Sequence, residues 1–145
     1  MSQTFTLAIT PELGALQDAQ AAIVAFGRQC ALPGRIQTAL DLVADEVISN
    51  IIRHGFSENQ ADRRITCEAM TETGAFILVF VDNGRPFDPL SDAPPPDLDS
   101  SIEDRAVGGL GVHIVKTLVD RCSYARDGGD NRLKLEWSKT EDQPG

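Results

Sequence analysis

The stretch IQTALDLVADEVISNIIRHGF, residues 36–56, carries an apolar stripe at helical spacing, interrupted by polar side chains. The apolar positions that recur at intervals of three or four are Ile36, Leu40, Val43, Val47 and Ile51. This spacing predicts a helix over residues 35–54, which a glycine ends. Glu46, Asn50 and His54 follow one another in steps of four, so a helix places them on nearly one face. Glu46 and Asn50 lie at the border of the stripe, where a helix and a sheet would form the rim of a groove.

Periodicity and turn residues predict the rest of the fold. The predicted elements are a strand at 4–9, helices at 11–30 and 35–54, strands at 63–72 and 75–82, a glycine-rich turn with a short helix at 108–120, and a hairpin at 123–137. The strand AFILVFVD, residues 75–82, is almost continuously apolar, which predicts burial on both faces. This order of elements predicts an α+β fold, a two-layer sandwich in which helices cover one face of a mixed, mostly antiparallel sheet.

The chain has 145 residues, which predicts a single domain over residues 1–145. Residues 85–107 differ from their surroundings, because five of the eight prolines fall there, three of them in APPPDLD. A loop of this length is typical of a lid or a disordered insert. The polar end of the chain, residues 138–145, predicts a flexible tail.

The formal charge of −9 and the pI near 4.5 argue against a nucleic-acid partner and against an anionic membrane surface. An acidic protein can still bind a nucleotide, since backbone N–H groups and a metal ion neutralise phosphate locally. No stretch approaches the roughly 18 apolar residues of a membrane-spanning helix, and the start lacks the pattern of a signal peptide. The three cysteines are far apart in sequence, which favours reduced core residues in a cytoplasmic protein over disulfides or a metal cluster.

Two glycine motifs are candidates for ligand contacts. In VDNG, residues 81–84, Asp82 ends a strand and could accept a hydrogen bond from a ligand amine, while Gly84 would allow a close approach. The same letters are also typical of an ordinary turn that ends a strand. In GGLG, residues 108–111, the glycines precede a helix and could present free N–H groups to an anion, or could form a simple hinge.

The polar residues of the long helix suggest metal and proton chemistry. Asn50 can offer a neutral oxygen to Mg²⁺, a hard cation that takes oxygen ligands. Glu46, one turn earlier, could orient or deprotonate a hydroxyl group or a water molecule near a phosphate. The alternative is that both residues form an ordinary solvated flank of the helix.

Taken together, the three motifs resemble the N, G1 and G2 boxes of the GHKL ATPase superfamily, the Bergerat nucleotide fold. The N box is Glu46, Asn50 and His54, the G1 box is DNGRPFDP at 82–89, and the G2 box begins at 108–111. The resemblance covers roughly residues 5–137. Within the superfamily, the chain resembles the small bacterial anti-sigma-factor serine/threonine kinases, because it consists of one ATPase domain and its G1 box ends in Pro-Phe-Asp-Pro.

The resemblance implies ATP and Mg²⁺ as cofactors and a role for each motif residue. Asn50 would bind Mg²⁺, and Glu46 would be the general base. Asp82 would hold the adenine amino group, with Gly84 beneath the base. The G2 residues that would cradle the phosphates are Gly108, Gly109, Leu110 and Gly111. Arg105, just before them, is a candidate contact for the γ-phosphate, and residues 85–107 would be the ATP lid.

Two positions depart from the pattern of the superfamily. Pro86 stands where many members have a second glycine of the G1 box. Asn131-Arg132 stands where many members have a Gly-Thr pair before the last strand. A threonine hydroxyl near the adenine site is therefore missing or replaced by Asn131.

Two functions are consistent with these residues. The first is a protein serine/threonine kinase that phosphorylates a STAS-domain anti-sigma antagonist and sequesters a sigma factor or another effector. The second is a non-catalytic module that binds nucleotide and acts by sequestering its partner. Glu46 favours the first, since a pseudokinase could lose its base freely. The family resemblance also implies a homodimer.

Overall fold

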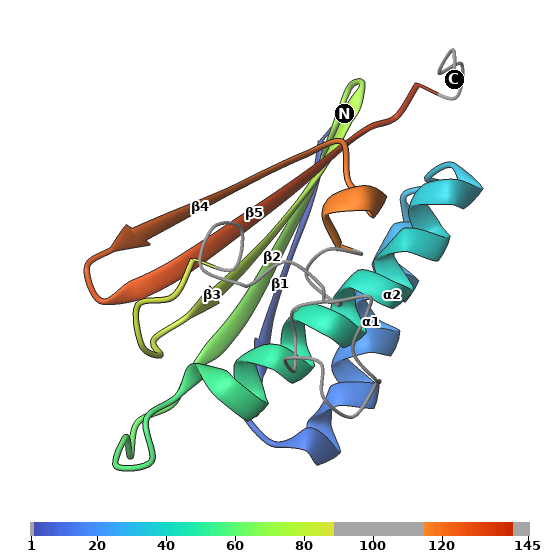
Figure 1. Ribbon diagram of the computed structural model, residues 1–145. Coiled ribbons are helices and arrows are strands. Elements are labelled where there is room, and N and C mark those ends of the chain that lie inside the picture. Colours follow the sequence, from blue (N-terminus) through green and yellow to red (C-terminus); the bar gives the residue numbers. More distant parts are fainter. Residues whose placement is uncertain (1, 89–114, 141–145) are drawn as a thin grey trace, which may run out of the picture.

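The computed structural model describes residues 2–88 and 115–140, which form two layers (Figure 1). A five-stranded sheet forms one layer, and two long helices pack against one of its faces. In chain order the elements are β1 (Gln3–Ile9), η1 (Leu13–Ala15), α1 (Leu16–Gln29), α2 (Gly34–Asn50), η2 (Ile51–Gly55), β2 (Ile65–Glu72), β3 (Ala75–Asp82), β4 (Arg121–Asp127) and β5 (Asp130–Ser138). The predicted α+β sandwich is confirmed.

The strand order is β1-β2-β3-β5-β4, and each described pairing is antiparallel. Two of these pairs, β2–β3 and β4–β5, join strands that are consecutive in the chain. The connection through α1 and α2 brings the chain back so that β2 runs antiparallel to β1. The predicted turn between β4 and β5 has positive φ at Gly128 and Gly129 (58° and 91°). That pair of angles is typical of a type I′ turn, whose twist matches the strands. In the described sheet no parallel pair occurs, whereas the sequence predicted a mixed sheet.

The core lies between the sheet and the two helices. Phe26 of α1 lies 6.2 Å from Phe76 of β3, and Phe76 lies 6.0 Å from Trp137 of β5, measured between ring centroids. The indole Nε1 of Trp137 donates to the backbone oxygen of Leu118 at 2.7 Å, which fixes the helical turn at 115–118 against β5. The helices approach closely at Gly27, where a Cβ would lie 2.5 Å from Leu40 Cδ1.

Burial of β3 on both faces was a wrong prediction. Its side chains alternate, since Phe76, Leu78 and Phe80 are buried and the residues between them are half-buried. Within the described residues, the helices cover only one face of the sheet (Figure 1). The apolar run of β3 therefore supplies the core on one side, and on the other it forms a surface that no described helix covers. The uncovered positions of β3 include Ile77, Val79 and Val81.

Both long helices were predicted, but their ends differ from the expectation. Before α1 the chain makes the short 3-10 helix η1, so α1 starts at Leu16 and not at residue 11. The second predicted helix ends as the π-helix η2, Ile51–Gly55. A π-helix bonds residue i to i+5 and is often found at functional sites.

The flexible tail does not begin at residue 138. The backbone N–H of Lys139 donates to the carbonyl of Gly74 at 3.0 Å, and its ammonium group donates to Thr71 Oγ1 at 2.8 Å. The guanidinium of Arg35 donates to the carbonyl of Ser138 at 2.5 Å. Residues 138–140 are therefore held against β2 and α2, and residues 141–145 lie outside the described part of the chain.

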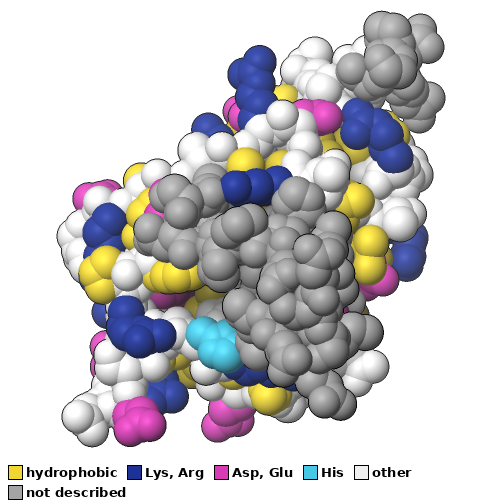
Figure 2. Space-filling view, viewed as in Figure 1, with side chains coloured by type: hydrophobic (Ala, Val, Ile, Leu, Met, Phe, Trp, Pro, Cys, Tyr) yellow, Lys and Arg dark blue, Asp and Glu magenta, His cyan; other side chains and the backbone are white. Residues whose placement is uncertain are grey.

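The described surface carries charges of both signs. On the face drawn in Figure 2, Lys and Arg side chains are interspersed with Asp and Glu, without one large basic patch among the described residues. None of the helices within residues 2–88 and 115–140 is long and apolar enough to cross a membrane.

Candidate functional site

Glu46 and Asn50 contact each other on the last turns of α2. The amide Nδ2 of Asn50 donates to Glu46 Oε2 at 3.3 Å, and both side chains are half-buried. This bond turns the amide nitrogen toward the carboxylate, so the carbonyl oxygen Oδ1 points away from it. The pair thus presents a neutral oxygen suited to a hard cation beside a carboxylate suited to accept a proton.

The π-helix η2 connects this pair to the glycine motif after β3. The carbonyl of Gly55 accepts a hydrogen bond from the backbone N–H of Arg85 at 2.8 Å, and the carbonyl of His54 accepts one from the Arg85 guanidinium at 2.5 Å. The end of the N-box helix and the start of the G1 box are therefore joined. The His54 side chain is exposed, unlike Glu46 and Asn50.

Gly84 is a glycine because the backbone of η2 lies directly against it. A Cβ at this position would lie 2.2 Å from Gly55 O and 2.9 Å from Asp82 Oδ1. A side chain cannot fit at that distance. In the structure Gly55 of the chain itself lies close to Gly84. The ligand contact that the sequence assigned to Gly84 stays a prediction.

Asp82 ends β3 on the face that the helices cover, and it is only 7% exposed. Its Oδ1 accepts two hydrogen bonds, from Gly84 N at 2.9 Å and from Asn131 Nδ2 at 3.0 Å. Among the described residues none donates to Oδ2. The buried carboxylate therefore keeps one oxygen that can only accept a hydrogen bond, as required for a ligand N–H.

The environment raises the pKa of Asp82 above its ordinary value. Burial is the main cause, because it disfavours the charged form. The hydrogen bonds from Asn131 and Gly84 and the charge of Arg126 lower the pKa, and Asp130 raises it. A buried carboxylate with a perturbed pKa and a free acceptor atom is a feature of binding sites.

The β4–β5 hairpin supplies three polar side chains around Asp82. Asn131 pairs with Asp82 in the register between β5 and β3, and Arg126 pairs with Asn131 in the next strand. The Arg126 Nη1 donates to Gly84 O at 2.9 Å and to Asn131 Oδ1 at 3.2 Å. The Tyr124 hydroxyl also donates to Asn131 Oδ1.

Sequence reasoning missed Tyr124 and Arg126 and weighed Asn131 only as a substitute for a threonine. The signal that could have found them is the Gly128-Gly129 turn. A two-residue turn fixes the register of its hairpin and places these side chains on one face.

The described residues fit Mg²⁺ only together with a phosphorylated ligand. Within residues 2–88 and 115–140 no three His, Cys, Asp or Glu side chains gather at one point. Mg²⁺ is commonly held by one or two protein oxygens, with substrate phosphates and water completing its shell. Asn50 Oδ1 beside Glu46 is consistent with such a site.

The phosphate-binding part of the prediction lies outside the described residues. This applies to the G2 residues Gly108, Gly109, Leu110 and Gly111, to Arg105, and to most of the lid segment 85–107. At the start of that segment, the backbone N–H of Phe87 donates to Asn131 Oδ1 at 3.4 Å.

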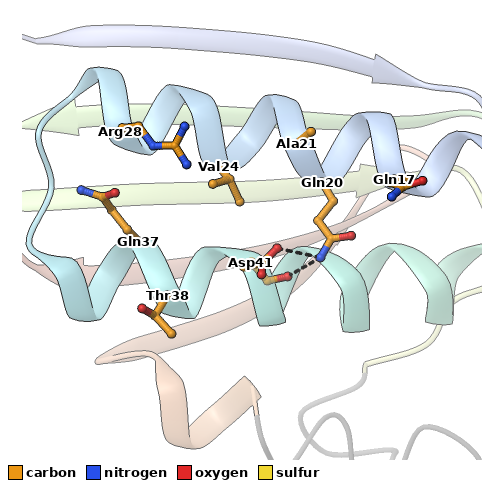
Figure 3. Close-up of a pocket in the computed structure, with 8 residues that line it drawn as sticks. All are labelled: Gln17, Gln20, Ala21, Val24, Arg28, Gln37, Thr38 and Asp41. Carbon is orange, nitrogen blue, oxygen red and sulfur yellow. Dashed lines mark hydrogen bonds between the residues drawn. The ribbon is translucent and has the colours of Figure 1, made fainter.

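A separate groove of about 530 Å³ lies between α1 and α2 (Figure 3). Its lining residues are Gln17, Gln20, Ala21, Val24, Arg28, Gln37, Thr38 and Asp41. The Gln20 amide crosses the groove and donates to Asp41 Oδ1 at 2.8 Å. The lining contains none of the motif residues, so this groove is distinct from the candidate site.

Comparison with known families agrees with this geometry. The sequence pattern of the histidine kinase-like ATPase domain matches residues 9–137. The chain belongs to the histidine kinase-like ATPase domain family. This confirms the superfamily inferred from the three boxes, and the family is one of ATP-binding domains.

Two protein kinases of this type are similar to the chain. The serine/threonine-protein kinase BtrW of Bordetella bronchiseptica is 32% identical over 101 residues, which is 70% of either chain. The serine-protein kinase RsbW of Listeria monocytogenes is 29% identical over 93 residues, 62% of this chain and 59% of that protein. The predicted similarity to serine/threonine kinases is confirmed.

The fold is also found in a solved structure. The crystal structure of the RsbU and RsbW domains of Rv1364c from Mycobacterium tuberculosis superposes with a TM-score of 0.66 at 12% identity. The superposition covers 94% of this chain and 32% of the other. It supports the histidine kinase-like fold for nearly the whole chain.

Proposed function

We propose that this chain is an ATP-dependent serine/threonine protein kinase of a bacterial partner-switching system. Its substrate is a STAS-domain anti-sigma antagonist, and it sequesters a sigma factor or another effector. The observation that carries the proposal is the Glu46–Asn50 pair, a base candidate and a metal-ligand candidate in contact at 3.3 Å. The similarity to two serine kinases supports the same function.

In the proposed reaction, bound Mg·ATP supplies the γ-phosphoryl group. Asn50 Oδ1 would hold Mg²⁺, and Asp82 Oδ2 would accept a hydrogen bond from the adenine amino group. The oxygen of the substrate hydroxyl bonds to the γ-phosphorus, and the bond between that phosphorus and the departing ADP oxygen breaks. Glu46 takes the proton of the hydroxyl group in the same step. The G2 residues 108–111 and Arg105 complete the phosphate contacts, with residues 85–107 as the lid.

The proposal places the reaction in the cytoplasm. All three cysteines are free, and burial raises the pKa of the Cys67 thiol to about 12. Such a thiol is inert and suits a reducing compartment. Partner switching with a sigma factor would also take place there.

We further propose that the chain forms a homodimer through the uncovered face of the sheet. Val79 lies at its centre, between Glu68 on β2 and Lys134 on β5 in one row of the register. A two-fold axis along β3 would place Glu68 opposite Lys134 of the second copy. An axis across the strands would instead place like charges together, so charge complementarity favours the first arrangement.

Two substitutions on α2 test the kinase function. In Glu46→Gln, transfer of labelled γ-phosphate to a STAS-domain partner protein should fall by roughly 10²–10⁴, while Mg·ATP still binds. Asn50→Ala should lose Mg²⁺-dependent ATP affinity as well as transfer. Because the two side chains are hydrogen-bonded, the double variant should lose less than the sum of the two effects.

Asp45→Asn is the matched control, since Asp45 is an exposed acid on the same helix. It should transfer phosphate at the wild-type rate. If Glu46→Gln transfers phosphate as fast as the control, Glu46 is only a solvated polar residue at the side of the helix and not the base. If the wild type binds the STAS protein tightly but transfers no phosphate to it, the chain is a non-catalytic module that sequesters its partner.

A further inference from the structure

Asn131 is buried between Asp82 and the segment that follows β3, with only 6% of its surface exposed. Its Nδ2 donates to Asp82 Oδ1 at 3.0 Å and to Arg85 O at 2.7 Å. Its Oδ1 accepts from Tyr124 OH and from Arg126 Nη1. Every hydrogen-bonding group of the amide thus has a partner.

This set of partners fixes the orientation of the amide. A flipped Asn131 would point its oxygen at Asp82 Oδ1 and Arg85 O, and its N–H groups at the donors Tyr124 and Arg126. The contacts with Asp82, Arg85 and Arg126 would then each join two acceptors or two donors. Only Tyr124, whose hydroxyl can also accept, could still pair with the flipped amide. Because unpaired buried polar groups cost free energy, the hairpin side chains hold Asn131 as a donor toward Asp82.

The orientation of Asn131 determines which atom of Asp82 remains for a ligand. Gly84 N and Asn131 Nδ2 both donate to Oδ1, so the carboxylate cannot rotate without losing two hydrogen bonds. Oδ2 is left as the acceptor. A 6-amino purine offers an N–H to such an atom, whereas a 6-oxo purine offers a second acceptor.

We propose that Asn131, oriented by Tyr124 and Arg126, is a positioning residue that holds Asp82 for recognition of a 6-amino purine. The inference rests on the proposed ATP site and adds to it a residue that lies outside the three boxes. Asn131 also contacts Arg85 O and Phe87 N, so it ties the base-binding carboxylate to the root of the proposed lid.

The charged groups that act on Asp82 are Arg126 on β4, which favours its ionised form, and Asp130 on β5, which opposes it. The hydrogen bond from Asn131 also favours the ionised form. Removing this donor raises the pKa of Asp82 further. The loss of ATP affinity on acidification should then begin at a higher pH.

A matched pair of variants tests the proposal. Asn131→Thr keeps a hydroxyl donor, and Asn131→Val has the same shape without it. Affinities for ATP and for inosine triphosphate, the 6-oxo analogue, are measured by calorimetry with Mg²⁺ from pH 5 to pH 8. Asn131→Val should bind ATP about tenfold more weakly than Asn131→Thr, discriminate less against inosine triphosphate, and lose ATP affinity at a higher pH.

A second variant tests the proposal independently, in case Asn131→Val does not fold. Tyr124→Phe keeps the ring but removes a donor to Asn131 Oδ1, so it should weaken ATP binding several-fold in the same direction. Ser123→Ala, on the opposite face of β4, should bind ATP as the wild type does. Thermal unfolding followed by circular dichroism reports whether each variant is folded.

The outcomes separate this inference from the kinase proposal. If the valine and threonine variants are folded and bind ATP equally, with the same pH dependence, Asn131 has only a structural role and the inference fails. If the wild type binds ATP but transfers no phosphate, the kinase proposal fails and the inference stands. If the wild type binds neither nucleotide, both fail.

Discussion

The burial of Asp82, which serves its proposed role in adenine recognition, has a cost in stability. It is a nearly fully buried carboxylate whose Oδ1 is satisfied and whose Oδ2 has no donor among the described residues. Burial raises its pKa, so the folded chain holds this proton to a higher pH than the unfolded chain does. Stability therefore falls as the pH rises through the window above the ordinary aspartate pKa.

This cost leads to a prediction for Asp82→Asn. The amide oxygen can still accept from Gly84 and Asn131, and the buried charge is removed. The free energy of unfolding at pH 7 should rise by about 0.5–2 kcal/mol, as for many substitutions at functional sites. ATP affinity should fall by about 1–3 kcal/mol, because the adenine amino group would face a donor.

Urea unfolding and calorimetry measure the two effects. The gain in stability should disappear as the pH is lowered through the titration of Asp82, since the wild-type charge is then neutralised as well. Asp127→Asn, an exposed position at the end of β4, is the control and should change neither quantity. Unchanged ATP affinity in Asp82→Asn would remove Asp82 from the site.

At the scale of elements, the π-helix η2 and the turn after β3 act as one unit. The carbonyl of Gly55 accepts from Arg85 N and leaves no space for a Cβ at Gly84. This contact holds the end of α2, with Glu46 and Asn50, against the strand that ends in Asp82. The two motifs come together through backbone atoms, which need a glycine at the point of contact.

Gly84→Ala tests this contact. The added Cβ would lie 2.2 Å from Gly55 O, so the backbone must shift. We expect a loss of about 1–3 kcal/mol in the free energy of unfolding, together with weaker ATP binding, as for other overpacked sites. Urea unfolding measures the first effect and calorimetry the second.

Gly34→Ala is the control, because a Cβ there meets nothing within 4 Å. It should leave stability within about 0.5 kcal/mol of the wild type. A Gly84→Ala variant as stable as this control would contradict the contact between η2 and the turn.

At the scale of the whole molecule, the sheet has one covered and one uncovered face (Figure 1). The uncovered face has Val79 at its centre, with Glu68 on one side and Arg132 and Lys134 on the other. Glu68 and Arg132 form an ion pair of 3.3 Å across β3. An apolar centre with acidic and basic sides is self-complementary under the two-fold axis along β3.

The proposed dimer is tested by Val79→Glu and Lys134→Glu. The first buries a charge at the centre of the interface, and the second places an acid opposite Glu68 of the second copy. Sedimentation should show a dimer for the wild type and a shift toward monomer for both variants, with ATP binding retained. Leu42→Glu, at an exposed position of α2, should sediment as the wild type. A wild type that remains monomeric would rule out the dimer.

The sequence by itself predicted the strands and the two long helices, apart from the exact helix ends, and it identified the family. Strand and helix periodicities, the Gly128-Gly129 turn and the run of residues 75–82 are local patterns, so steric preferences and burial within a few residues fixed β3 and β5 closely. The three boxes identified the histidine kinase-like ATPase family because their residue types and order are specific together. The roles of Glu46, Asn50 and Asp82 remain proposals that the geometry supports.

Only the tertiary structure decided how these pieces meet. Asn131 bonds to Asp82 from 49 positions along the chain, because β3 and β5 are neighbours in a particular register. Position 84 has no space for a side chain, because the carbonyl of Gly55 lies against it. One face of β3 is not covered by the described helices, because these helices form a single layer. Register, layer number and close backbone contacts arise between segments distant in sequence, and local periodicity carries no information about them.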